Sequence, residues 1–105
     1  MKAAVVERKS THYVLRLYVT GFSPRSMRAI SNTRKICEKH LSGRYDLELV
    51  DIAQHPDQAA SEQVIAAPTL IKASPIPIRR FIGDMSQTER ILVGLGIGLT
   101  QQLPL

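Results

Sequence analysis

Apolar and polar residues alternate in two stretches of the first half of the chain. In Tyr13–Val19 the odd-numbered positions are all apolar or aromatic, whereas Arg16 interrupts the even-numbered ones. A period of two places these sets on opposite faces of a strand. Residues 45–52 alternate in the same way. We therefore predict two strands, and we expect the second face of the first strand to be half-buried.

The segment between these strands has helical spacing. Its predicted core positions are Met27, Ile30, Cys37 and Leu41. Ser23 is suited to the N-cap, and Pro24 to the first helical position, because its missing N–H has no partner there. Gly43 is suited to follow the end of the helix. A strand, a helix and a second strand form a βαβ unit, which predicts a parallel pair of strands.

The second half carries weaker signals. A short helix is predicted over 57–67, where little apolar surface is available to fix it. Residues 69–73 and 79–82 are predicted strands, joined by a proline-rich connection at 74–78. The order is then βαβαββα if the chain ends in a helix, and it matches the thioredoxin fold. We expect one α/β domain over 1–105.

Signals conflict in the last element. Ser86 and Glu89 fit a capping box, so a helix is expected to begin at Ser86. Gly94, Gly96 and Gly98 then disfavour a helix, and their spacing of two suits one face of a strand. We therefore predict two accessible structures for residues 53–100, a thioredoxin-like monomer and an oligomer with this run as a strand. Residues 1–11 are expected to be flexible and 100–105 to form a short tail.

Charge narrows the class of partner. The chain has 14 basic and 9 acidic residues, a net charge of +5 and a pI near 9.8. This balance favours acidic partners through long-range steering. A base-stacking platform is not evident among three Tyr, two Phe and no Trp. The sequence has no pattern of a signal peptide or membrane span, so we expect a cytoplasmic protein without a stable membrane anchor.

The sequence lacks the residues that redox catalysis or metal binding would need. Thioredoxin-like proteins carry a Cys-x-x-Cys motif in the turn before the first helix, but here Phe22 and Arg25 stand at those positions around Pro24. Pro68 stands where the same proteins carry a cis-proline. Cys37 is the only cysteine, and the three histidines have no ligand spacing. We expect no catalysis, no metal and no cofactor.

Four stretches resemble the KaiB family of circadian clock proteins. They are LYVTGFSPRSMRAI, ICEKHLSGRYDLELVDI, AAPTLIKASPIPIRRFIGDMS and the ERILVGL run. The resemblance implies a protein without a reaction of its own that binds the ring-shaped ATPase KaiC. It also implies competition with a sensor kinase, capture of the activator KaiA, and exchange of a tetrameric βαββααβ ground state with the thioredoxin-like binding state. Distant members suggest a stress pathway as an alternative to a clock.

Basic residues at matched positions are the candidate partner contacts: Arg28, Lys72, Arg79 and Arg80. The plainer interpretation of such residues is a solvated helix face or protection of an edge strand. Pro68, Asp84 and Gly94 are expected to be structural. Two other functions stay open from the sequence. One is a thioredoxin-like redox protein that uses Cys37, and the other is a small basic nucleic-acid-binding module.

Overall fold

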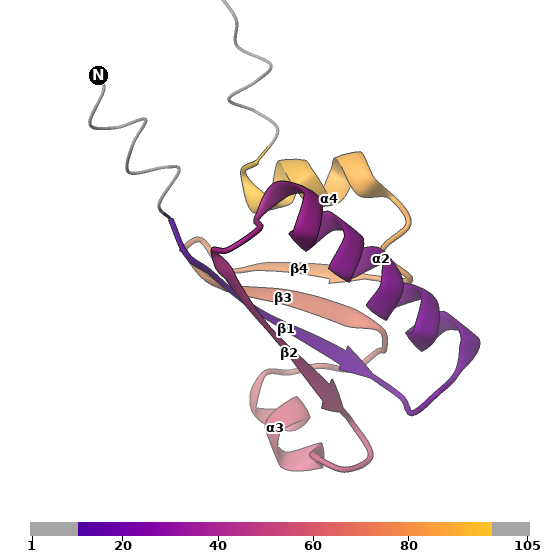
Figure 1. Ribbon diagram of the computed structural model, residues 1–105. Coiled ribbons are helices and arrows are strands. Elements are labelled where there is room, and N and C mark those ends of the chain that lie inside the picture. The colour runs from indigo at the N-terminus through magenta and orange to yellow at the C-terminus, as the bar shows by residue number, and fades with distance from the viewer. Residues whose placement is uncertain (1–10, 98–105) are drawn as a thin grey trace, which may run out of the picture.

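The computed structural model describes residues 11–97 (Figure 1). Its elements are β1 (Tyr13–Val19), α2 (Pro24–His40), β2 (Tyr45–Asp51), α3 (Pro56–Ser61), β3 (Thr69–Ser74), β4 (Arg79–Ile82) and α4 (Thr88–Leu95). The predicted α/β class and the order βαβαββα are confirmed. The expected flexible segment 1–11 and the tail 100–105 lie outside the described residues, apart from Thr11.

The four strands form one mixed sheet in the order β2-β1-β3-β4. β1 and β2 are parallel, with Tyr13 opposite Tyr45 and Val19 opposite Asp51. β3 is antiparallel to both of its neighbours, β1 and β4. This parallel pair confirms the prediction from the βαβ pattern. Parallel neighbours need a crossover connection, and α2 provides it. β2 and β4 form the two edges of the sheet.

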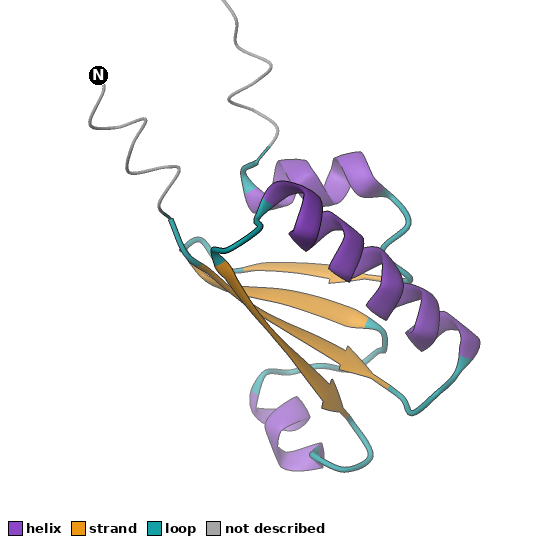
Figure 2. Ribbon diagram, viewed as in Figure 1, coloured by secondary structure: helices purple, strands orange, loops and turns teal. Residues whose placement is uncertain are grey.

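Helices cover both faces of this sheet (Figure 2). α2 and α4 pack on one face, and α3 packs on the other. The larger core lies under α2 and α4, and its buried residues are Tyr13, Leu15, Leu17, Val19, Ala29, Ile36, Cys37, Leu41, Leu70, Met85, Ile91 and Leu95. The smaller core lies under α3 and consists of Tyr18, Val50, Ala59 and Ile71. The alternation in β1 therefore predicts its two faces correctly.

α2 begins as predicted, and three of its four predicted core positions lie in or against the larger core: Cys37 and Leu41 are buried, and Ile30 is partly buried. Ser23 is the N-cap, and its hydroxyl accepts a hydrogen bond from the Ser26 N–H at 3.2 Å. The residues of the helix that face the sheet are Ser26, Ala29, Thr33, Ile36 and Cys37. Met27, predicted to face the core, is 47% exposed, so that prediction is wrong. Small residues such as Ser26 and Ala29 suit close packing on the sheet, but they carry little hydrophobic signal.

α3 is shorter than the helix predicted over 57–67. It spans Pro56–Ser61, and the His55 side chain at its N-cap makes no capping hydrogen bond. Ala59 is its only buried residue. The segment has too little apolar surface to extend the helix further.

α4 begins one residue later than the capping box predicts, because that motif places the N-cap at Ser86. Gln87 is the N-cap and its side chain makes no capping hydrogen bond. Ser86 instead belongs to the preceding turn, where its N–H donates to Asp84 Oδ1 at 3.1 Å. The helix ends at Leu95, and its C-cap Gly96 adopts a left-handed φ of 76°, a conformation that glycine tolerates best. Gly94 lies inside the helix against Phe81, whereas Gly98 lies outside the described residues.

Candidate interaction surface

Three segments meet at one end of the sheet, where a thioredoxin-like protein would carry its reactive cysteines. Pro68 follows a cis peptide bond, and its carbonyl accepts a hydrogen bond from the Gly83 N–H at 3.0 Å. The Arg25 side chain approaches Gly83 from α2, because a methyl group added at Gly83 would lie 3.9 Å from Arg25 Nη2. Phe22 is 90% exposed in the turn before α2. This end of the molecule therefore presents an aromatic ring and a cation in place of thiols.

Cys37 lies in the larger core and is 1% exposed. Burial raises the pKa of its thiol to about 11, and the nearby Glu38 carboxylate adds to the effect. The reactive form of cysteine is the thiolate, which this environment disfavours. The geometry therefore gives no support to a redox role for Cys37.

Arg80 belongs to a group of polar side chains on the α3 face of the sheet. We call this group the Glu62 cluster, and its members are Arg16, Tyr18, Glu62 and Arg80. Arg16 Nε and Nη2 each donate to the Glu62 carboxylate at 2.8 Å, and the Tyr18 hydroxyl donates to Glu62 Oε1. Arg80 donates to the main-chain carbonyls of Glu62 and Gln63, the latter at 3.4 Å. The cluster fastens the end of α3 to β1 and β4.

Arg28 and Asp84 connect α2 to the turn after β4. Arg28 Nε donates to Asp84 Oδ2 at 3.3 Å, and Asn32 Nδ2 donates to the Asp84 carbonyl at 2.9 Å. Hydrogen bonds from Ser86, and to a smaller extent from Arg28, hold the pKa of the Asp84 carboxyl below its usual value. The Asp84 carboxylate is therefore already satisfied within the chain.

Arg79 and Lys72 are opposite each other on β4 and β3. Lys72 is only 4% exposed, and burial together with the charge of Arg79 lowers the pKa of its ammonium group. The Arg79 side chain is exposed and makes no hydrogen bond or ion pair within residues 11–97. Lys72 is inaccessible in this conformation, so it is left out of the contact surface proposed below.

The structure does not gather the four predicted contact residues into one patch. Arg79 lies on the face of the sheet that α2 and α4 cover, and Arg80 lies on the opposite face, because adjacent residues of a strand alternate. Sequence reasoning missed Glu62, which organises the polar side of α3. The available signal was Arg16, a charge on an otherwise apolar strand face that required a buried partner.

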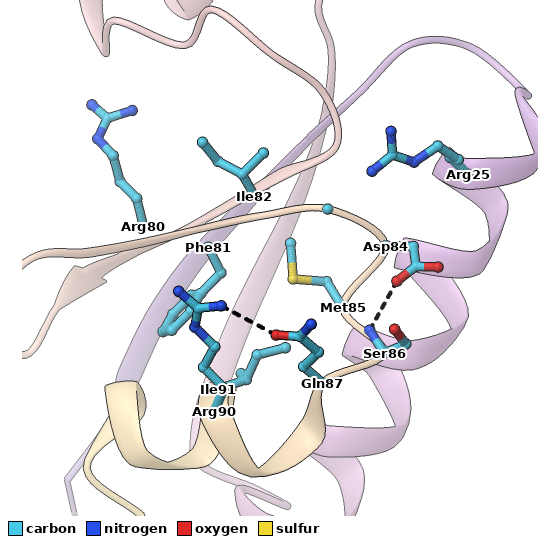
Figure 3. A pocket seen from close by; sticks show the side chains of 11 residues that line it. Arg25, Arg80, Phe81, Ile82, Asp84, Met85, Ser86, Gln87, Arg90 and Ile91 are labelled. Carbon is cyan, nitrogen blue, oxygen red and sulfur yellow. Dashed lines mark hydrogen bonds between the residues drawn. The ribbon is translucent and has the colours of Figure 1, made fainter.

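A pocket of about 470 Å³ runs along β4, and we call it the β4 groove. Residues 80–87 line it together with Arg25 of α2 and with Arg90 and Ile91 of α4 (Figure 3). Met85 and Ile91 are buried at its base, at 4% and 3% exposure. The lining therefore combines three arginines with one carboxylate, that of Asp84.

The sequence matches known clock proteins over most of its length. Residues 16–97 match the family model described as the KaiB domain. The chain is 48% identical over 94 residues to circadian clock protein KaiB3 of Synechocystis sp., which covers 87% of this chain and 92% of that protein. It is 45% identical over 85 residues to the circadian clock oscillator protein KaiB of Prochlorococcus marinus, covering 81% and 71%.

Solved structures share the fold at low sequence identity. The N-terminal domain of SasA from Synechococcus elongatus superposes with a TM-score of 0.70 at 20% identity, over 90% of both chains. Mitochondrial thioredoxin 3 of Saccharomyces cerevisiae gives a TM-score of 0.67 at 13% identity, also over 90% of both. These likenesses confirm the predicted thioredoxin-like architecture.

Two further features bear on the class of protein. Within residues 11–97, no cluster of three or more His, Cys, Asp or Glu side chains is arranged to hold a metal ion. None of the helices in this range has the length and apolar character needed to cross a bilayer.

Proposed function

This chain belongs to the KaiB family, and from that premise we propose that it is a non-enzymatic adaptor that binds a KaiC-type ATPase and regulates its output. The observation that carries the proposal is the 48% identity to KaiB3, which extends over 92% of that clock protein. The pathway is then a circadian clock or a stress response derived from one. The partners proposed beside the ATPase are a KaiA-type activator and a sensor kinase that competes for the same ring.

The described residues fit an adaptor better than a thiol enzyme. The turn before α2 carries Phe22 and Arg25 where thiols would stand, and Cys37 is buried under α2. The fold that the chain shares with the SasA N-terminal domain supports competition for a common binding site. We further propose that the chain forms a homo-oligomer in its unbound state.

Arg79 offers the clearest test of a basic contact surface. The side chains of Arg28 and Arg80 make hydrogen bonds between elements, to Asp84 and to the Glu62 carbonyl respectively. Reversing their charge would therefore perturb folding as well as binding. Arg79→Glu changes only an exposed side chain that is unpaired among residues 11–97. We expect it to weaken binding to a purified KaiC-type ATPase by about fivefold, and binding by the unmodified protein to weaken as salt rises.

Lys39→Glu is the matched control, because it makes the same charge change at an exposed position in the last turn of α2. Co-elution with the ATPase and titration by biolayer interferometry measure both variants. No binding by the unmodified protein would contradict the proposed function. Equal weakening by both variants would leave the function in place but contradict a specific contact at Arg79.

A further inference from the structure

The outer edge of β4 offers unpaired backbone groups beside the β4 groove. Gly83 N–H donates to the Pro68 carbonyl at 3.0 Å, which continues the β3–β4 register in which Thr69 lies opposite Ile82. Hydrogen-bonded and non-hydrogen-bonded pairs alternate along an antiparallel ladder. Arg80 and Ile82 are therefore in non-hydrogen-bonded pairs, and their N–H and C=O groups point away from β3. No strand within residues 11–97 covers this edge.

The charge beside this edge is positive and largely unneutralised. The Arg25 side chain makes no hydrogen bond or ion pair with any of residues 11–97, and the Arg90 side chain donates only to Gln87 Oε1 at 3.2 Å. Figure 3 shows the Arg80 side chain directed to the other side of β4 from Phe81 and Arg90. The Asp84 carboxylate is already satisfied by Ser86 and Arg28. On the α2 and α4 side of the groove, Arg25 and Arg90 are thus cations without a carboxylate partner among residues 11–97.

We propose that the β4 groove binds an extended acidic segment of a partner protein, which adds as a further strand to the outer edge of β4. Backbone groups of Arg80 and Ile82 would pair with the segment, and its carboxylates would lie against Arg25 and Arg90. Main-chain pairing supplies affinity in this mode of recognition, and side chains at alternate positions supply specificity. This inference does not rest on the proposed function, because it concerns the free edge and its charge alone.

Two other occupants of the groove, a second copy of the chain and a single-stranded nucleic acid, fit it less well. A second copy of the chain paired along β4 would bring like-charged Arg79 and Arg80 side chains together, an arrangement that protects an edge from self-association. Single-stranded nucleic acid would supply negative charge but needs aromatic platforms for its bases. Phe81 is the one aromatic residue of the groove, and it packs against the larger core.

Binding of a short synthetic peptide of alternating glutamate and threonine tests the proposal. We expect saturable binding by fluorescence anisotropy, with the largest amide shifts in NMR spectra at Arg80 and Ile82. Arg25→Glu and Arg90→Glu should each weaken binding by about fivefold. Lys39→Glu should leave it unchanged, because Lys39 lies 14 residues beyond Arg25 on α2, about 21 Å along the helix axis. Circular dichroism verifies that each variant is folded.

Two altered probes separate strand addition from simple charge attraction. The same peptide with an N-methyl group on every residue keeps its charge but loses all of its backbone donors, so it should bind at least tenfold more weakly. Equal binding of both peptides would overturn the proposal, as would the absence of binding at about 1 mM peptide. Tighter binding of a single-stranded oligonucleotide, lost in the same two variants, would assign the groove to nucleic acid instead.

Discussion

Glu62 is the residue on which the α3 side of the molecule depends. Its carboxylate accepts two hydrogen bonds from Arg16 and one from Tyr18, and its carbonyl accepts one from Arg80. Both side chains of the Arg16–Glu62 pair are about a quarter exposed, so solvent screens the pair only in part. The hydrogen bonds from Arg16, followed by the one from Tyr18, hold the pKa of Glu62 below its ordinary value of 4.5.

Glu62→Gln should therefore destabilise the protein in a pH-dependent way. A carboxyl group whose pKa is lowered by folding stabilises the native state above its unfolded pKa, and loses that effect as pH falls through the folded pKa. We expect the free energy of unfolding at pH 7 to fall by about 1–2 kcal/mol in the variant. The unmodified protein should lose part of this advantage below about pH 4.5, so the two should converge on acidification.

Urea unfolding at pH 7 and pH 3.5 measures this difference. Glu89→Gln is a suitable control, because it makes the same chemical change at an exposed side chain with no hydrogen bond or ion pair inside the described range. A difference in stability that stays constant between the two pH values would contradict the role assigned to the Glu62 carboxylate.

At the scale of elements, Gly94 marks the close approach of α4 to β4. A methyl group at this position would overlap the ring of Phe81. Gly94→Ala should gain about 1 kcal/mol of helix propensity, yet we expect a net loss of stability of about 1–2 kcal/mol because the ring or the helix must move. Thermal unfolding monitored by circular dichroism provides the measurement.

The double variant Gly94→Ala with Phe81→Leu tests the cause. A smaller side chain at position 81 leaves room for the methyl group, so the double variant should lose less stability than the sum of the two single variants. Additive losses would indicate that Gly94 is required for a reason other than its contact with Phe81.

Elements whose sequence signals are local and strong were predicted correctly, whereas elements that depend on small residues or on contacts within a turn were not. The two faces of β1 follow from a strict alternation of large apolar residues, and the start of α2 follows from Ser23 and Pro24. Met27 was misplaced because Ser26 and Ala29 form the buried stripe, and small residues carry little hydrophobic signal. The start of α4 was misplaced because the turn uses Ser86 as a donor to Asp84, which local spacing does not reveal.

The candidate site was less predictable than the fold for a related reason. Sequence reasoning found the basic residues of β4, and the alternation of a strand already places Arg79 and Arg80 on opposite faces of the sheet, but it did not reveal the burial of Lys72. It also missed Glu62, which lies 46 residues from Arg16, and the edge beside Arg25 and Arg90. These features depend on contacts between distant segments, and no local pattern specifies such contacts.

At the scale of the whole molecule, the two halves of the chain are held by unequal contacts. β1 and α2 supply most of the buried residues of the larger core, residues of β2 pack against them, and the structure over residues 13–52 follows strong local signals. α3 instead buries only Ala59 and depends on the Glu62 cluster. α4 ends within the run that contains Gly94 and Gly96. A net stability of about 5–15 kcal/mol leaves room for a second packing of such a weakly fixed half.

We therefore predict that residues 13–52 keep one structure while residues 53–100 exchange between two. One is the thioredoxin-like arrangement described above, and the other is the βαββααβ arrangement, in which the glycine run is a strand in an oligomer. Mass action favours the oligomer as concentration rises, so NMR spectra of a dilution series should contain two sets of peaks for 53–100 and one for 13–52. Glu62→Gln should shift the balance toward the oligomer, because it weakens hydrogen bonds that hold α3 in the thioredoxin-like arrangement, whereas Glu89→Gln should not. One set of peaks at every concentration, in the unmodified protein and in Glu62→Gln alike, would mean that the second half of this chain has a single structure.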